Sequence, residues 1–281
     1  MRKFCLIGHP LGHSLSPQIH ARLFELSGES AEYTLVDIAP EELKSKFETL
    51  DKYDGFNITI PHKMAIIDYC GELSEGARRY GSVNCVKNGD VKLGCNTDCI
   101  GFTKSIELLG ASLASKVLLI GCGGVGRMMA IETAMNGGEL SIAALKSDLP
   151  LVEKVIEEIH ELKPDAHVRV AMISGNAISA EDLNHEEFDL LINASPVGMF
   201  PKVDRMPCAA DVLDNVKFVF DAIYNPRDTL LIKTAREKGC KAKNGMAMLV
   251  LQAVAAHEIW DGASYNKDDI DRLISDMEAL V

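Results

Sequence analysis

The chain has 281 residues, of which 47% are hydrophobic and 25% are charged. These proportions are typical of soluble globular proteins and exclude disordered, collagen-like and coiled-coil classes. Because 41 Asp and Glu outnumber 29 Lys and Arg, the formal net charge is −12, which argues against a nucleic-acid or anionic-membrane binder. A chain of this length most often forms two domains of about 100–200 residues each.

Membrane and metal signals are weak. The longest apolar stretch, 246–256, contains Gln252 and falls short of the ~18 residues that a membrane span needs. No signal-peptide core precedes the strand-like run that begins at residue 4. The eight cysteines contain no C-x-x-C pair. We therefore expect a cytoplasmic protein with mostly buried, unpaired cysteines, no metal site and no membrane partner.

The first hundred residues alternate short apolar runs with amphipathic stretches. A helix is expected from Ser16, its predicted N-cap, to Gly28. Thr97 or Asp98 is expected to cap another helix that runs toward residue 109. The turn signal Asn88-Gly89 predicts a β-hairpin between 83–87 and 91–94. The remaining predictions are strands over 4–7, 33–38 and 55–60 and a helix over 41–50.

From residue 116 onward, buried strands alternate with helices. Strands are predicted over 117–120, 140–144, 168–173, 190–193 and 218–223, and helices over 125–136, 150–162, 229–239, 246–260 and 268–280. Continuous apolar strands that alternate with helices are typical of a parallel sheet covered on both faces. The fold class is therefore α/β, and the change of pattern places a domain boundary near 100–115.

The segment Gly121-Cys122-Gly123-Gly124-Val125-Gly126 matches G-x-G-x-x-G between a buried strand and a helix. In that context the glycines allow a tight turn and a close approach of backbone amides to a pyrophosphate. The helix N-terminus adds about half a positive charge, which is how an acidic chain can hold an anionic cofactor. A purely structural glycine turn is the alternative interpretation.

The end of the next strand bears on the choice of cofactor. NAD sites usually carry Asp or Glu there, about 20 residues after the glycines. In this chain Lys146 and Ser147 occupy the position and suit a 2′-phosphate, whereas Asp148 is close enough to bind a ribose hydroxyl. The pattern favours NADP and leaves NAD possible.

Four polar clusters follow predicted strands or precede predicted helices in the first half. They lie at 12–17, 57–63, 81–84 and 94–98. Open α/β sheets bind ligands at strand ends, so these clusters predict a small-molecule site.

Five motifs resemble those of the shikimate dehydrogenase family, in order along nearly the whole chain. They are Ser14-Leu15-Ser16-Pro17, Asn57-x-Thr59-x-Pro61-x-Lys63, Asn96-Thr97-Asp98-x-x-Gly101-Phe102, Asn193-Ala194-Ser195-Pro196-Val197-Gly198-Met199 and Met248-Leu249-Val250-x-Gln252. The resemblance implies reversible NADP-linked reduction of 3-dehydroshikimate to shikimate, a step toward chorismate and the aromatic amino acids.

The resemblance also implies a two-domain organisation and a set of site residues. A substrate-binding and catalytic α/β domain would span 1–103 and be joined by returning C-terminal helices over 247–281, and a Rossmann-like, doubly wound parallel-sheet NADP domain would span 104–246. The implied residues are Lys63 and Asp98 for catalysis; Ser14, Ser16, Thr59, Asn84, Tyr224 and Gln252 for substrate; and Gly121, Gly123, Gly124, Val125, Gly126, Asn193, Ala194, Ser195, Ala222 and Gly245 for cofactor. Lys146 and Ser147 join the cofactor residues because of their position at the predicted strand end.

Three departures from the family pattern leave alternatives open. Ala21 stands where many relatives have Asn, Cys85 where Thr is usual, and Leu145-Lys146-Ser147 where Asn-Arg-Thr is common. A catabolic NAD(P)-dependent quinate/shikimate dehydrogenase is therefore the second hypothesis, and a catalytically silent, ligand-sensing paralogue is the third. We expect a monomer or a homodimer that binds a small-molecule substrate and no nucleic acid.

Lys63 is the side chain in these motifs best suited to ketone reduction. As a positive hydrogen-bond donor it stabilises charge that develops on the carbonyl oxygen, while the nicotinamide supplies the hydride. Asp98 would orient Lys63 and bind a substrate hydroxyl. His13 and His62 have no identifiable partner in the sequence, so we leave both out of the mechanism.

Overall fold

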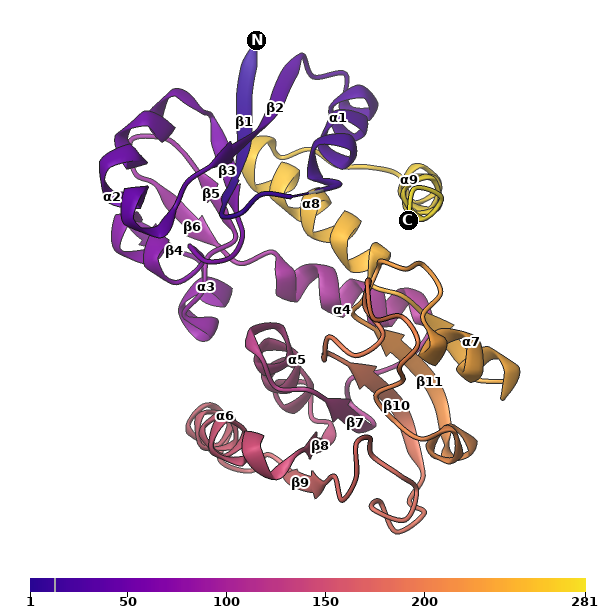
Figure 1. The fold of residues 1–281 in the computed structure, drawn as a ribbon. Helices are drawn as coiled ribbons and strands as arrows, with labels where there is room; N and C mark the ends of the chain where they lie inside the picture. The colour runs from indigo at the N-terminus through magenta and orange to yellow at the C-terminus, as the bar shows by residue number, and fades with distance from the viewer. Residues whose placement is uncertain (13) are drawn as a thin grey trace. The chain divides into compact units, whose positions relative to one another are not determined.

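The computed structural model describes residues 1–12 and 14–281, so His13 lies outside the described residues. The chain has an α/β fold that divides into two compact units (Figure 1). Unit 1 comprises Met1–Gly101 and Leu249–Met277, and unit 2 comprises Phe102–Met248 and Glu278–Val281. The division falls inside α4 (Asp98–Leu109) and α8 (Met246–Asp261) and before the last residue of α9 (Lys267–Glu278).

Unit 1 contains a six-stranded mixed sheet in the order β2-β1-β3-β5-β6-β4. Its strands are β1 (Arg2–Gly8), β2 (Ala31–Asp37), β3 (Gly55–Ile58), β4 (Glu72–Leu73), β5 (Cys85–Lys87) and β6 (Leu93–Cys95). The pairs β1–β2, β1–β3 and β4–β6 are parallel, whereas β5 is antiparallel to both β3 and β6. The parallel part leaves the carboxyl ends of β1 and β3 side by side, where the first two polar clusters begin.

Helices cover the sheet of unit 1. They are α1 (Ser16–Ser27), α2 (Leu43–Lys46), α3 (Glu75–Tyr80), the unit-1 part of α8, and α9 (Lys267–Glu278). Three 3-10 helices add to them, at Pro40–Glu42, Phe47–Lys52 and Ala65–Tyr69. Helix α8 is anchored by Trp260, whose ring stacks on Phe4 at 4.5 Å between centroids and whose Nε1 donates to the carbonyl oxygen of Val86 at 3.0 Å. The C-terminal segment is therefore part of the core of unit 1.

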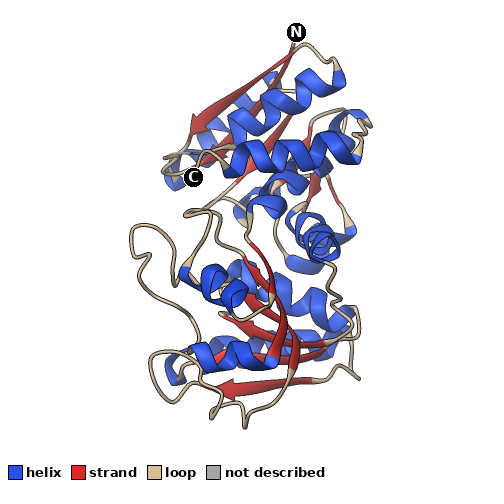
Figure 2. Cartoon of the chain, turned by 90° about the vertical axis from the view of Figure 1, so that its right-hand side faces the viewer, coloured by secondary structure: helices blue, strands red, loops and turns tan. Residues whose placement is uncertain are grey.

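Unit 2 is a doubly wound parallel sheet in the order β12-β11-β10-β7-β8-β9. Its strands are β7 (Lys116–Ile120), β8 (Glu139–Ala144), β9 (Val168–Met172), β10 (Phe188–Asn193), β11 (Val216–Asp221) and β12 (Lys241–Lys243). Helices α5 (Gly124–Met135) and α6 (Leu149–Leu162) pack along β7–β9, and α7 (Leu230–Glu237) packs on β11 and β12. Helices flank this sheet on both sides (Figure 2). A 3-10 turn at Lys146–Asp148 and a 3-10 helix at Ala210–Asn215 complete the unit.

Strand order reverses between β7 and β10. Ligands of open α/β sheets bind at such a switch point, outside the carboxyl ends of the strands. The strand ends concerned lead into Gly121 and Asn193, so the topology places two of the predicted cofactor segments next to one another.

Two predictions about helices are wrong. Ser16 is the first residue of α1 rather than its N-cap; Leu15 holds the cap position without a side-chain bond. The helix predicted over 41–50 is broken into two 3-10 turns around the four-residue α2.

Two strand predictions also need correction. The strand predicted to reach residue 60 ends at Ile58, because Thr59 turns the chain by accepting a hydrogen bond from the His62 amide at 3.0 Å. The hairpin of β5 and β6 exists, but Lys87 pairs with Leu93, so its loop is longer than a two-residue turn. The side-chain Nδ2 of Asn88 instead donates to the carbonyl oxygens of Leu50 and Tyr53.

Candidate functional site

Lys63 and Asp98 form an ion pair in unit 1. The Lys63 Nζ donates to the Asp98 Oδ2 at 2.7 Å, and the two side chains are 24% and 12% exposed. Lys63 is held by its carbonyl oxygen, which accepts from the Val83 amide at 2.8 Å. Asp98 begins α4, where its negative charge is favoured by the helix dipole. The pair therefore presents an oriented cation that a ligand can still reach.

Asn84 connects three segments beside this pair. Its Nδ2 donates to the Thr97 Oγ1 and to the Gln252 Oε1, each at 3.0 Å. Its Oδ1 accepts from the Thr97 amide at 2.7 Å. Asn84 is buried and Gln252 is half-buried, so part of the Gln252 side chain stays accessible beside Asn84. The structure thus brings together Lys63 and Asp98 with two of the predicted substrate residues.

Asn57 and Thr97 support this arrangement and were not among the predicted site residues. The Asn57 Nδ2 donates to the carbonyl oxygen of Asn84 at 3.2 Å, and Tyr33 donates through its hydroxyl to the Asn57 Oδ1 at 2.8 Å. Both residues stand inside the quoted motifs, so motif membership was the available signal. His62 is buried and its Nε2 contacts the carbonyl oxygen of Ile38 at 2.6 Å, which is a structural role.

Of the three hydroxyl residues, Ser14 and Thr59 lie in the loops that follow β1 and β3, and Ser16 begins α1. The Ser16 amide donates to the Ser14 Oγ at 3.2 Å. A Cβ on Gly8 would collide with the Thr59 side chain, so the close approach of the two loops requires glycine at that position. Across the described ranges 1–12 and 14–281, the hydroxyls of Ser16 and Thr59 have no hydrogen-bond partner. They are available to a ligand.

The glycine-rich turn of unit 2 has the geometry of a phosphate cradle. Gly121 has φ +93°, a left-handed conformation that favours glycine. A Cβ on Gly126 would collide with the carbonyl oxygen of Gly121, whereas a Cβ on Gly123 or Gly124 would meet nothing within 4 Å. The turn is therefore closely packed where Gly126 meets Gly121 and unobstructed beside Gly123 and Gly124, at the N-terminus of α5. Such a site accommodates a pyrophosphate.

The loop that follows β10 packs against this turn, and the loop that follows β11 packs against Gly245 after β12. A Cβ on Gly121 would lie 2.8 Å from the amide nitrogen of Ser195, and one on Gly245 would collide with the carbonyl oxygen of Ala222. Asn193 is fully buried, and its Oδ1 accepts from the amide and the hydroxyl of Ser195 at 3.0 and 2.7 Å. The predicted cofactor residues of these loops are thus neighbours in space.

Tyr224, predicted as a substrate residue, follows β11 in unit 2 rather than belonging to the cluster of unit 1. It is half-buried, and burial raises the pKa of its hydroxyl. The hydroxyl is therefore neutral, a hydrogen-bond donor, at physiological pH.

A short 3-10 turn follows β8 and carries Lys146, Ser147 and Asp148. The Ser147 hydroxyl donates to the Asp148 Oδ1 at 3.0 Å. Lys146 is exposed and has no ion-pair partner among the residues described. Arg127 of α5, by contrast, donates through Nε to Glu158 at 2.7 Å. Lys146 is therefore suited to pair with a phosphate at the carboxyl end of β8.

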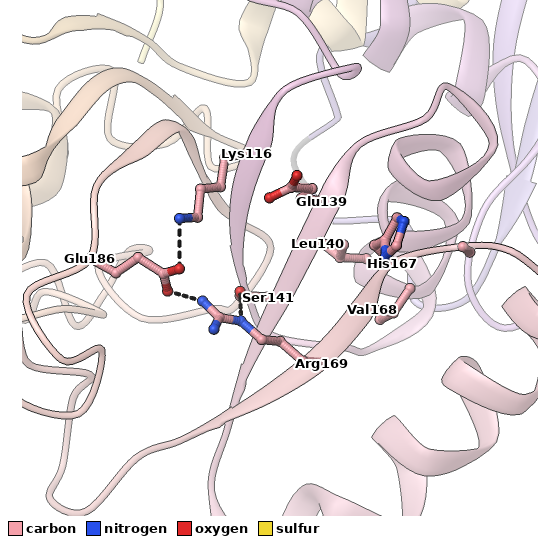
Figure 3. Close-up of a pocket in the computed structure, with 9 residues that line it drawn as sticks. Lys116, Glu139, Leu140, Ser141, His167, Val168, Arg169 and Glu186 are labelled. Carbon is pink, nitrogen blue, oxygen red and sulfur yellow. Dashed lines mark hydrogen bonds and ion pairs between the residues drawn. The ribbon is translucent and has the colours of Figure 1, made fainter.

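A cavity of about 450 Å³ lies elsewhere in unit 2 (Figure 3). Lys116, Glu139 and Val168, which line it, are the first residues of β7, β8 and β9, so it lies at the amino edge of the sheet. Lys116 pairs with Glu186 at 2.6 Å, and Arg169 pairs with the same carboxylate. None of the predicted site residues lines this cavity, and its two cations share Glu186 as an ion-pair partner.

The described part of the chain contains no group of three His, Cys, Asp or Glu side chains arranged to hold a metal ion. Within the same residues, every helix is too short or too polar to cross a bilayer.

Comparisons with known proteins show the family to which the chain belongs. Residues 6–86 match the family model described as the shikimate dehydrogenase substrate binding domain. A shikimate dehydrogenase (NADP(+)) of Caldanaerobacter subterraneus subsp. tengcongensis is 37% identical over 274 residues, which cover 94% of this chain and 93% of that protein.

Two solved structures are similar over nearly the full length. A shikimate dehydrogenase in complex with NADP+ is 32% identical with a TM-score of 0.86, covering 99% of this chain and 96% of that chain. The shikimate 5-dehydrogenase of Listeria monocytogenes in complex with shikimate and NAD is 31% identical with a TM-score of 0.86, covering 98% of this chain and 96% of that one. With motifs, fold and full-length identity in agreement, the chain belongs to the shikimate dehydrogenase family.

Proposed function

We propose that this protein is a shikimate dehydrogenase that reversibly reduces 3-dehydroshikimate to shikimate with NADPH, as a step of chorismate and aromatic amino acid biosynthesis. The observation that supports it most directly is the Lys63–Asp98 ion pair at 2.7 Å beside the Asn84–Gln252 contact at 3.0 Å. This combination joins an oriented cation to amide groups that suit a polyhydroxylated substrate. Full-length relatives of the same name support the same activity.

Substrate recognition divides between two kinds of group. The free hydroxyls of Ser16 and Thr59, with that of Ser14, donate to the substrate carboxylate, because hydroxyls offer donors without a competing charge. Gln252 provides amide groups for the ring hydroxyls, and Asn84 holds the Gln252 side chain in place. Asp98 accepts from a further hydroxyl through an oxygen not used by Lys63.

In the proposed reaction, Lys63 stabilises the negative charge on the carbonyl oxygen and transfers the proton. The bound nicotinamide supplies the hydride that adds to the carbonyl carbon. The Lys63 Nζ donates a hydrogen bond to the carbonyl oxygen, stabilises the negative charge that develops there and delivers the proton that completes the alcohol. In the oxidation direction the amine takes that proton back. Asp98 keeps Nζ oriented through both directions.

The cofactor site belongs to unit 2. Backbone amides at Gly123 and Gly124 face the pyrophosphate, with Val125 and Gly126 forming the first turn of α5. The turn is open in front of these amides, so its shape fits the group. Lys146, with the hydroxyl of Ser147, is suited to the 2′-phosphate of NADP. We accordingly assign residues 104–246 to the NADP-binding domain, and residues 1–103 with 247–281 to the substrate domain.

A catabolic quinate/shikimate dehydrogenase that uses NAD(P) is the second candidate. The observation that favours it is Asp148, an acid next to Lys146 that is able to bind a ribose diol. A silent paralogue is disfavoured, because the Lys63–Asp98 geometry is intact. The eight cysteines, all within the described ranges, form no disulfide bond, which supports a cytoplasmic location for either enzyme.

Initial rates of shikimate and quinate oxidation, each with NADP+ and NAD+, test the proposal. We expect the highest kcat/KM for shikimate with NADP+. Higher kcat/KM for quinate or for NAD+ would favour the catabolic enzyme. Absence of turnover in all four combinations, with a folded protein that binds cofactor, would contradict both enzymes.

A further inference from the structure

Asp221 is a buried carboxyl group that the proposed chemistry does not use. It ends β11 and is fully inaccessible to solvent. In the part of the chain described, no lysine or arginine pairs with it. Burial raises its pKa to about 6, so the carboxylate is retained at a cost to stability at neutral pH. Buried groups of this kind concentrate at functional sites.

Neutral donors from two loops surround this carboxyl group. Its Oδ1 accepts from the Asn193 Nδ2 at 3.0 Å and from the Ile223 amide at 3.1 Å. Its Oδ2 accepts from the Thr229 hydroxyl at 2.6 Å. One side chain therefore joins the loop after β10 to the loop after β11 and to the N-cap of α7.

The bond to Asn193 leads to the glycine-rich turn. Asp221 fixes the side-chain amide of Asn193, whose opposite end, Oδ1, accepts from the amide and hydroxyl of Ser195. The Ser195 backbone packs so closely on Gly121 that a Cβ there would lie 2.8 Å from its nitrogen. Without the acceptor at position 221, the Asn193 Nδ2 would keep only its long 3.5 Å bond to the carbonyl oxygen of Val197, so the side chain that supports Ser195 would lose its shorter anchor.

The Ile223–Asp221 hydrogen bond supports the loop that follows β11. It holds the backbone just after Ala222, whose carbonyl oxygen packs on Gly245. The Gly245 amide donates to the carbonyl oxygen of Ile223 at 3.0 Å. Asp221 thus reaches the loop of Ala222 through one contact, the loop of Ser195 through two, and the turn of Gly121 through three.

We propose that Asp221 is a positioning residue that sets the mutual geometry of the loops around Gly121, Ser195 and Ala222, and thereby the affinity for the dinucleotide. This inference rests on the proposed cofactor site in unit 2. Asp221 does not touch the cofactor; it acts through Asn193 and the Ile223 backbone.

Three variants of the full-length protein test the proposal. Asp221→Asn keeps an oxygen for Asn193 and Ile223, and its new amide donates to the Thr229 hydroxyl in the opposite sense. Asp221→Leu has similar bulk and no acceptor. Thr229→Val is the matched control, because it removes the Thr229–Asp221 hydrogen bond and leaves the bonds of Asp221 to Asn193 and Ile223 in place. The readouts are Kd for NADP+, KM for each substrate, and the melting temperature.

We expect Asp221→Leu to raise Kd and KM for NADP+ at least about tenfold, since small displacements of positioning groups have large effects. The KM for shikimate should stay unchanged, because its site lies in unit 1. Asp221→Asn should bind NADP+ within about threefold of wild type, as expected when the acceptor is retained. Thr229→Val should lower the melting temperature without changing Kd.

Two results would overturn the inference. One is a folded Asp221→Leu protein with wild-type Kd for NADP+. The other is a proportional loss of stability and affinity in all three variants, which would mark Asp221 as structural only. If Asp221→Leu does not fold, Asp221→Ser, which leaves room for a water molecule on the same donors, makes the same comparison; failure of both to fold would likewise assign Asp221 to stability alone. A wild type that binds neither NADP+ nor NAD+ would instead refute the proposed cofactor site.

Discussion

Asn84 donates a hydrogen bond to Gln252 at 3.0 Å across 168 positions of the sequence. The contact requires the C-terminal helix α8 to pack within unit 1, where Trp260 anchors it. Gln252 therefore belongs to the proposed substrate site through tertiary structure alone.

Gln252→Ala should raise the KM for shikimate about tenfold with a smaller effect on kcat. The variant removes one substrate contact and one of the two hydrogen bonds that the Asn84 Nδ2 donates. A hydrogen bond contributes about 1–1.5 kcal/mol. Steady-state kinetics at saturating NADP+ measures both constants. Glu258→Gln, an exposed change on the same helix, should be silent. An unchanged KM in the Gln252 variant would remove that residue from the site.

Lys63→Met should lower kcat by about 10²–10³, the usual effect of losing one preorganised donor to a developing oxyanion. Binding of NADP+ should change little, since the cofactor residues are in unit 2. Lys92→Met is a close control: Lys92 is 23% exposed against 24% for Lys63, and it also pairs with an aspartate, at 2.8 Å. Near-normal kcat in a folded Lys63→Met protein would exclude Lys63 from the mechanism.

Lys146→Ala should raise the KM for NADP+ a few-fold and leave the KM for NAD+ unchanged. The effect is modest because an exposed ion pair contributes about 0–1 kcal/mol. Lys154→Ala, an exposed lysine of α6, serves as the control for net charge. Asp148→Ala should be nearly silent if Lys146 faces the 2′-phosphate. Improved use of NADP+ by that variant would show that Asp148 faces it instead.

Acidification should destabilise unit 1 through a buried histidine pair. The His20 Nδ1 and the His257 Nε2 lie 3.0 Å apart. Burial lowers both pKa values, that of His257 to about 3. The unfolded chain binds protons near pH 6.5 while the folded chain does not, so the free energy of unfolding falls as pH drops below 6.5. At pH 5 His257 should contribute a loss of about 2 kcal/mol, and His20 acts in the same direction.

Urea unfolding between pH 5 and 8, followed by Trp fluorescence, measures this effect. The single Trp260 stacks on Phe4 and so reports on unit 1. His257→Phe should flatten the pH dependence, whereas His160→Gln, an exposed site in unit 2, should leave it as in wild type. A wild-type curve that does not fall below pH 6.5 would contradict the assignment of neutral, buried rings.

Much of the architecture and the main chemical groups could be predicted from sequence because their signals are local. Continuous apolar strands alternating with helices indicate a parallel sheet whatever the distant contacts are. The turn from Gly121 to Gly126 follows from backbone sterics, since Gly121 needs a positive φ. Lys63 and Asp98 were found because the motifs around them are contiguous.

Other features were decided only by tertiary structure. Asn88 was expected to form a tight turn, but the carbonyl oxygens of Leu50 and Tyr53 bind its amide. Ser16 was expected as a cap, yet its own amide donates to Ser14. In both cases a polar side chain has several local options of similar free energy, and packing with remote segments selects one.

Asp221 shows the same limit most clearly. Its sequence neighbours mark it as a residue at a strand end, and nothing local indicates that Asn193, Ile223 and Thr229 will all direct donors at it. A buried carboxyl obtains its environment from strand order and register, which bring β10 beside β11. Residue type and spacing determine which chemistry the chain can carry out; the packing of distant strands determines which groups surround each reacting or supporting atom.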